Sequence, residues 1–203
     1  GSITWHGSMA QVPGGLPTLV LMHEFLDALP IHQFQYTERG WLEKLVDVER
    51  DEDKNAFRFV LSPGPTVASR MFDRFLPYGP SLKHGDRVEI CPQALSLSVA
   101  VARHIQQYTG VALFIDYGRF HSFPESLRGI YNQKARGVLE DPGNVDISAS
   151  VDFAAMDKVV RDAEGIDLGL VNSFPSISQQ DFLLNIGIDA RLAQLIRRAP
   201  ETK

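Results

Sequence analysis

The sequence predicts an α/β fold built around a parallel sheet, and three observations indicate this class. Two short apolar segments, residues 18–23 and 111–115, have the length and composition of buried strands. Each segment runs directly into an acidic turn, which begins at Glu24 in one case and at Asp116 in the other. An amphipathic helix is predicted between them, over Pro92–Tyr108. This order is typical of α/β proteins, which bind ligands at the carboxyl ends of parallel strands.

The residues after the first strand predict a small antiparallel β insertion over residues 31–61. Polar and apolar side chains partly alternate over residues 31–37, and residues 41–48 and 57–61 have the composition of strands. The charged residues 50–55 between the last two segments predict a solvated hairpin loop.

The middle of the chain predicts a short helix, a loop and a strand before the long helix. Thr66 is expected to cap a helix that runs to Phe75, because its hydroxyl can accept a hydrogen bond from the first turn. Residues 76–86 are rich in Pro and Gly and predict a loop, and residues 88–90 predict a short strand. Gly110 is expected to end the long helix.

The last part of the chain predicts more helices than strands. Residues 119–143 show no periodic pattern and are expected to be irregular. The further expected elements are extended backbone over residues 146–150, a helix over 153–163 capped by Asp152, a strand over 166–173, a helix that opens at Ser178 and ends at Gly187, and a last helix over 189–198 capped by Asp189.

The composition argues against several functional classes. A net charge of -5 over 203 residues does not favour a broad nucleic-acid-binding surface. No apolar run reaches the length of a membrane span, and the single cysteine, Cys91, permits no disulfide within the chain. The histidines do not have metal-ligand spacing, so we expect no metal site. The chain also lacks the Gly-x-Ser-x-Gly, P-loop and Gly-x-Gly-x-x-Gly motifs, so a hydrolase or P-loop nucleotidase is poorly supported.

Glu24 and Asp27 are the candidate functional carboxylates, because they lie close together after a predicted strand. They could bind a cationic ligand or take up a proton. The structural alternative is that Asp27 caps a helix while Glu24 is solvated, and the spacing alone leaves this alternative open. Asp116, Tyr117 and Gly118 repeat the theme after the second strand, where an ordinary exit from the strand is the alternative.

A series of ordered segments makes the chain similar to the MidA-like methyltransferase family, whose mitochondrial members are assembly factors of respiratory complex I. The most specific segment is His-Glu-Phe-Leu-Asp-Ala-Leu-Pro at residues 23–30. The other similar segments are residues 31–35, 40–41, 59–63, 88–92, 116–118, 127–129, 142–143, 146–148, 151–153 and 180–192.

This resemblance implies the C-terminal part of a Rossmann-like methyltransferase fold that binds S-adenosylmethionine. The family's glycine-rich donor-binding loop precedes these segments, so we expect residues 1–203 to be a fragment of a single domain without that loop. The implied activity of the full-length protein is methylation of a protein arginine, with a complex I subunit as the implied substrate. The implied location is the mitochondrial matrix for a eukaryotic protein and the cytoplasm for a bacterial one.

The resemblance also assigns roles to the two acidic turns. Glu24 and Asp27 would be the catalytic pair that orients the acceptor guanidinium. The substrate-binding residues would be Phe25, Pro30, Asp116, Tyr117 and Gly118. A non-enzymatic binding or assembly module that contacts a partner subunit is the alternative function. Half of a sheet would leave an open strand edge, so we also expect the chain to form homo-oligomers.

Overall fold

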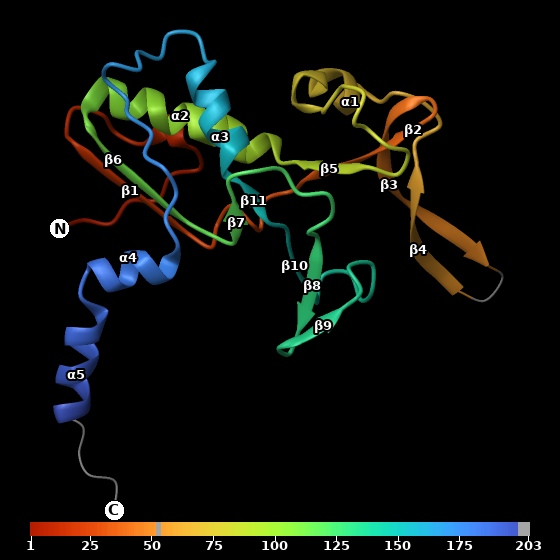
Figure 1. The fold of residues 1–203 in the computed structure, drawn as a ribbon. Helices are drawn as coiled ribbons and strands as arrows, with labels where there is room; N and C mark the ends of the chain where they lie inside the picture. The colour runs from red at the N-terminus through yellow and green to blue at the C-terminus, as the bar shows by residue number, and fades with distance from the viewer. Residues whose placement is uncertain (52–53, 199–203) are drawn as a thin grey trace, which may run out of the picture. The chain divides into compact units, whose positions relative to one another are not determined.

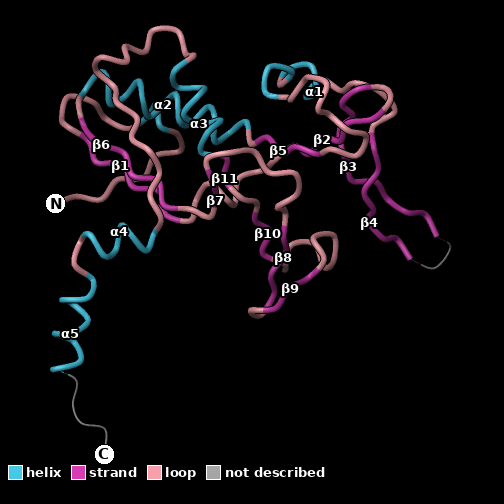
Figure 2. The backbone as a smooth tube through the Cα atoms, in the orientation of Figure 1, coloured by secondary structure: helices cyan, strands magenta, loops and turns pink. Residues whose placement is uncertain are grey.

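The computed structural model describes residues 1–51 and 54–198, which divide into two compact units (Figure 1). Unit 1 spans Gly1–Asn172, and unit 2 begins at Ser173. Among the described residues, all strands lie in unit 1, and unit 2 contains two helices (Figure 2).

Unit 1 is a mixed α/β structure. Its elements are, in chain order, η1 (Met9–Gln11), β1 (Thr18–His23), β2 (His32–Thr37), β3 (Gly40–Asp51), β4 (Lys54–Leu61), α1 (Val67–Met71), η2 (Asp73–Phe75), β5 (Arg87–Ile90), α2 (Pro92–Tyr108), β6 (Gly110–Ile115), β7 (Gly118–Arg119), β8 (Arg128–Tyr131), β9 (Lys134–Arg136), β10 (Asp146–Ser148), β11 (Val151–Asp152) and α3 (Phe153–Arg161).

Strands β1 and β6 form the predicted parallel pair, with α2 packed against both of them (Figure 1). The register runs from Thr18 opposite Gly110 to His23 opposite Ile115. A Cβ atom on Gly110 would lie 2.1 Å from the carbonyl oxygen of Thr18, so the close approach of the strands requires glycine. The prediction that Gly110 ends α2 was wrong, because Thr109 (φ 64°) is the C-cap and Gly110 is already in β6.

The strands of the parallel pair are not buried, contrary to the prediction. Leu19, Leu21 and Val111 are 72%, 61% and 57% exposed, and exposure alternates along β1. The reason is that this sheet has two strands among the described residues and that α2 packs against the pair. The pair therefore has one covered face and one that exposes a row of apolar side chains.

A second sheet is antiparallel, with the strand order β4-β3-β2-β5. Its first three strands lie where the sequence predicts them, and β5 adds a fourth strand from beyond residue 61. Strands β3 and β4 run further than predicted, so the expected loop at 50–55 is largely strand. The cross-strand pairs continue to Asp51 opposite Lys54, and residues 52 and 53 lie outside the described part of the chain.

Short strands account for most other differences from the predictions. The region expected to be irregular contains the antiparallel hairpin β8–β9, and β10 pairs with β8. The strand predicted over residues 166–173 is wrong, because turns occupy part of this segment. The Asp167 carboxylate accepts a hydrogen bond from the Gly169 N–H (2.8 Å), and the Leu170 N–H donates to the Asp167 carbonyl (2.9 Å). This local hydrogen bonding competes with strand pairing.

The predicted helices form, with adjusted ends. Thr66 caps α1 as predicted, but the helix stops at Met71 and a 3-10 turn follows. Asp152 caps α3 by accepting a hydrogen bond from the Ala155 N–H (2.9 Å). No described helix is long and apolar enough to cross a membrane.

One apolar core joins the antiparallel sheet, α2, α3 and the loop after β1. Buried side chains from all four parts contact one another in this core. Its fully packed members are Leu26, Phe34, Trp41, Leu76, Val88, Ile90, Ala94, Leu95, Val151, Met156 and Val159. The core therefore fixes the loop that follows β1 to the body of unit 1.

Unit 2 consists of α4 (Gln179–Asn185) and α5 (Ile188–Arg198). Ser178 caps α4 by accepting a hydrogen bond from the Asp181 N–H (3.0 Å), as predicted. Gly187 (φ 84°) lies between the two helices. Helix α5 begins at Ile188, so Asp189 lies in its first turn and is not the predicted cap.

Candidate functional site

The loop after β1, residues 24–30, lies at the carboxyl end of the parallel pair. The Glu24 N–H donates to the Ile115 carbonyl (2.9 Å), which continues the β1–β6 hydrogen bonding by one residue. Glu24 itself has φ 47°, a left-handed conformation that turns the chain sharply away from the strand. Leu26 is buried in the core, and the Leu29 N–H donates back to its carbonyl (3.2 Å). Buried Leu26 thus anchors a tight turn.

Asp116 joins the two acidic turns to each other. Its Oδ2 accepts hydrogen bonds from the backbone N–H groups of Leu26 (2.9 Å) and Asp27 (3.3 Å). Its Oδ1 accepts from the N–H of Tyr117 (2.8 Å). The carboxylate therefore holds the loop after β1 from the end of β6. The structure brings these two turns together at one sheet edge, as the predicted topology requires.

Asp27 does not cap a helix, because its loop leads into strand β2. Its side chain is only 11% exposed, and its Oδ2 lies 3.9 Å from Nη2 of Arg128. Burial raises the pKa of the Asp27 carboxyl, and the neighbouring carboxylate of Asp116 raises it further, whereas Arg128 opposes the shift. Glu24 and Asp146 also raise this pKa. Asp27 is thus a largely buried carboxylate with a loosely placed cation beside it.

Arg128 connects Asp27 to the aromatic ring of Tyr117. The guanidinium carbon lies 5.3 Å from the centroid of the Tyr117 ring, within the range of a cation–π contact. Sequence reasoning gave Arg128 no role, although it lies in the similar segment 127–129. Its place beside Asp27 depends on how the β8 hairpin docks, which no local sequence pattern specifies.

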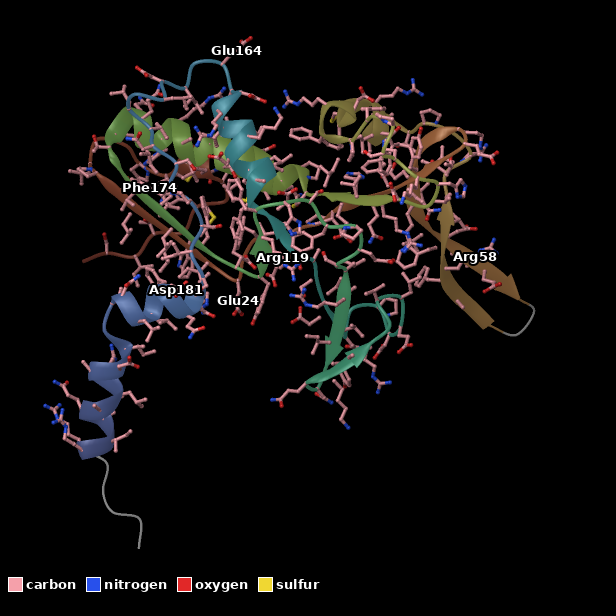
Figure 3. The ribbon with its side chains drawn as sticks, in the orientation of Figure 1. Glu24, Arg58, Arg119, Glu164, Phe174 and Asp181 are labelled. Atoms are coloured by element: carbon pink, nitrogen blue, oxygen red, sulfur yellow. The ribbon has the colours of Figure 1, made fainter. Side chains whose placement is uncertain are left out.

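The other predicted site residues differ in their solvent exposure. Phe25 and Pro30 are exposed on the loop, and the half-exposed Glu24 carboxylate lies 3.8 Å from Nε2 of His23. Gly118 lies in β7, where a Cβ atom would be 2.3 Å from the Val151 carbonyl oxygen. The observed role of this glycine is the close pairing of β7 with β11. Figure 3 labels Glu24 at the end of β1.

A buried carboxylate, Glu89, holds the segment that leads to Arg128. Its Oε1 accepts hydrogen bonds from Nε2 of Gln33 (2.8 Å) and from the N–H groups of Ser126 (2.9 Å) and Leu127 (3.3 Å). Its Oε2 accepts from the Ser126 hydroxyl, whose oxygen in turn accepts from the Ser150 N–H (2.8 Å). This network fixes the backbone at Ser126 and Leu127, just before Arg128, and ties it to Ser150.

A small cavity of about 60 Å³ lies under the loop, and Leu26, Glu89, Cys91 and Asp152 are among its lining residues. Small-molecule sites usually measure about 300–1,000 Å³, so this cavity is too small for a cofactor. Burial raises the pKa of the Cys91 thiol, which makes it a poor nucleophile. Burial also raises the pKa of Asp152, although the α3 N–H groups of Ala155 and Ala154 oppose this shift. Among the described residues, no three His, Cys, Asp or Glu side chains are arranged to hold a metal.

Comparison of this sequence with known proteins finds methyltransferases both among protein families and among individual relatives. A family of S-adenosyl-L-methionine-dependent methyltransferases matches residues 1–171. The mitochondrial protein arginine methyltransferase NDUFAF7 of Mus musculus is 36% identical over 199 residues, and that of Danio rerio is 39% identical over 194 residues. The alignments cover 98% and 96% of this chain but only 42% of each relative.

Solved structures extend this similarity to the fold. A crystal structure from Burkholderia thailandensis with bound S-adenosyl-homocysteine superposes with a TM-score of 0.69 at 25% identity. It matches 94% of this chain and 47% of its own length. A second structure from the same organism has a TM-score of 0.67 at 27% identity and covers 90% of this chain.

Proposed function

Because this chain belongs to the family of S-adenosyl-L-methionine-dependent methyltransferases, we propose that its protein methylates an arginine side chain of another protein. The names of the mouse and zebrafish relatives support this acceptor. The chain spans less than half the length of these relatives, so the activity of the whole protein is part of the proposal. The names of these relatives also support a mitochondrial location. The matrix and a complex I subunit as substrate are the finer part of the proposal and rest on the family resemblance alone.

The observation that carries the proposal is the position of Asp27 at the sheet edge. Its side chain is largely buried and lies near the charges of Glu24 and Asp116. It also faces Arg128, which in turn contacts the aromatic ring of Tyr117. A guanidinium is planar and carries donors that match a carboxylate, and it also stacks on aromatic faces. Asp27 would bind the acceptor guanidinium, and Glu24 would help to orient it for methylation.

The described residues do not build a complete site for the methyl donor. The chain contains no Gly-x-Gly-x-x-Gly sequence, and the cavity under the loop is too small for a nucleoside. We therefore place the main donor-binding loop in the portion of the relatives that this chain does not span. The residues of this chain would form the acceptor side, next to a donor held mainly by other residues.

The first test measures methyl transfer to an arginine peptide by the full-length protein. Asp27→Asn and Glu24→Gln remove one negative charge each with little change in shape. We expect Asp27→Asn to lower kcat/KM by about a hundredfold, because a buried acceptor ligand is lost, and Glu24→Gln to lower it by about tenfold. Glu164→Gln is the matched control, because Glu164 is exposed beyond α3 and is drawn far from Glu24 (Figure 3). Unchanged activity in both site variants would refute these roles.

A binding or assembly module is the alternative for this chain by itself, and the absence of a glycine-rich donor motif favours it. Calorimetry with S-adenosylmethionine distinguishes the two functions. Binding by the full-length protein but not by the 203-residue chain agrees with a donor loop outside this chain. Binding of comparable affinity by the chain alone would contradict that placement.

A further inference from the structure

Arg128 occupies the position that the proposed function gives to the acceptor arginine. Its guanidinium lies 3.9 Å from the carboxylate of Asp27 and 5.3 Å from the centre of the Tyr117 ring. A carboxylate on one side and an aromatic face on the other are the two contacts that a guanidinium prefers. The site therefore already contains a guanidinium, supplied by the chain itself.

We propose that Arg128 is an internal occupant of the acceptor site, which the acceptor arginine displaces when it binds to Asp27 and Tyr117. The inference rests on the proposed function, because it uses the same Asp27 carboxylate. It adds that the free protein has a self-occupied site and that Arg128 sets the affinity for the acceptor. The ligand class is an alkylguanidinium, and a primary ammonium lacks the planar fork that makes both contacts.

The contacts of Arg128 are loose enough to be exchanged. Strong arginine–carboxylate pairs have N···O distances of about 2.7–2.9 Å and are often bidentate, whereas Nη2 of Arg128 lies 3.9 Å from Oδ2 of Asp27. The Arg128 side chain is 37% exposed, so it can move into solvent without a large loss of packing. An incoming guanidinium that forms two direct hydrogen bonds to Asp27 would therefore bind more strongly than the internal one.

The backbone under Arg128, in contrast, is held firmly. Glu89 binds the N–H groups of Ser126 and Leu127, and the Ala149 N–H donates to the Asp27 carbonyl (2.8 Å). Displacement would therefore involve rotation of the Arg128 side chain and leave the surrounding loops in place. A fixed backbone with an exchangeable side chain is the arrangement that an internal competitor requires.

The local charge also favours a second guanidinium. Asp116, Glu24 and Asp146 surround Asp27 closely enough to raise its pKa, and Arg128 is the cation that opposes them. When Arg128 swings out, the Asp27 carboxylate can accept an external cation in its place, and the negative charge of the other three carboxylates favours that cation. The exposed position of Glu24 and Asp146 leaves a path for such a cation from solvent.

The test uses N-acetyl-arginine amide as the probe and measures its affinity for the full-length protein by NMR titration. We expect Arg128→Ala to bind the probe about three- to tenfold more tightly than the unmodified protein, because one ion pair and one cation–π contact no longer compete. Arg128→Gln, which keeps most of the side-chain length, should give a similar gain. N-acetyl-lysine amide should gain less in both variants.

Arg119→Ala is the matched control, because it removes an exposed arginine from nearby strand β7 and changes the net charge equally (Figure 3). It should leave the affinity for the probe unchanged. If Arg128→Ala and Arg128→Gln, with melting temperatures like that of the parent protein, bind the probe equally or more weakly, the inference is overturned. An equal gain in Arg119→Ala would overturn it as well, because the effect would then be general electrostatics.

A companion measurement separates this inference from the proposed function. Asp27→Asn should weaken probe binding in both the parent and the Arg128→Ala background. If Asp27→Asn changes neither probe binding nor methyl transfer, the proposed function fails. If Asp27→Asn weakens both while Arg128→Ala brings no gain, only the internal occupant is refuted. In the methyl-transfer assay, Arg128→Ala should lower the KM for an arginine peptide.

Discussion

At the scale of single residues, the site combines one carboxylate that is held and one that is available. Asp116 uses both oxygens to accept backbone hydrogen bonds, so its charge is engaged in shaping the loop. None of the described residues donates a hydrogen bond to the Asp27 carboxylate, and the cation beside it is Arg128 at 3.9 Å. A buried charge with weak compensation costs stability, and such residues are common where a ligand binds.

This cost predicts how the stability of the protein changes with pH. The pKa of Asp27 is raised in the folded state above its unfolded value of 3.8. The folded state therefore binds a proton more tightly, and Asp27 makes the fold less stable as pH rises through the interval above 3.8. Asp27→Asn should increase the free energy of unfolding at pH 7, and the gain should shrink as pH falls toward 3.8.

Urea unfolding of the parent chain and of Asp27→Asn between pH 4 and pH 7 checks this expectation. Glu164→Gln provides the control, since removal of an exposed carboxylate should give a small difference with little pH dependence. A larger advantage of Asp27→Asn at pH 4 than at pH 7 would contradict the direction of the pKa shift.

At the scale of secondary-structure elements, the site depends on the pairing of β1 with β6. This pairing places the loop after β1 beside Asp116, and it begins where Thr18 faces Gly110. Gly110 has φ 145°, a backbone conformation that side chains disfavour, and its Cα hydrogen points at the backbone of Thr18.

Gly110→Ala should lower the free energy of unfolding by about 2–4 kcal/mol, because a Cβ atom 2.1 Å from the Thr18 carbonyl oxygen forces the strands apart. Gly64→Ala is the control, because no atom lies within 4 Å of its added Cβ, and its effect should stay within about 0.5 kcal/mol. Chemical denaturation measures both values. Equal stability of the two variants would show that the strand pair adapts at Gly110.

The same scale shows which parts of the fold the sequence predicts. Strand β1 and helix α2 have the predicted bounds, because an apolar run or a 3.6-residue period extends over the whole element. Strands β7 to β11 contain two to four residues each, too few for any period to show. They form because tertiary packing brings their backbones together, and the sequence alone does not contain that information.

The candidate site could also be predicted from the sequence only in part. The meeting of the 24–30 loop with Asp116 follows from topology, because parallel strands place their carboxyl ends at one edge. The position of Arg128 beside Asp27 does not, since it depends on the docking of β8 and on the hydrogen bonds of buried Glu89. Buried polar networks of this kind have no signature in a single sequence.

At the scale of the whole molecule, the parallel pair exposes a row of apolar side chains to solvent. Leu19 and Leu21 project from the open side of β1, where contact of their apolar side chains with water is unfavourable in free energy. The edges of this two-stranded sheet also present backbone groups that can pair with another strand.

We therefore expect the 203-residue chain to self-associate at micromolar concentrations, as measured by light scattering over a dilution series. The double variant Leu19→Lys/Leu21→Lys should shift the chain toward monomer, because the two charges oppose association through this face. Val67→Lys, which changes an equally exposed apolar residue on α1, should have little effect. A monomeric parent chain at all concentrations would refute the expectation.

The bond between Asp116 and the Leu26 N–H also has a consequence for the order of folding. Its two residues are 90 positions apart in the chain, and the whole antiparallel sheet and α2 lie between them. Closing so long a loop is entropically unfavourable until the intervening elements have become compact. The β1–β6 pair should then form late, after the local hairpins. An incompletely folded chain would therefore lack the proposed acceptor site and could not yet recognise a substrate.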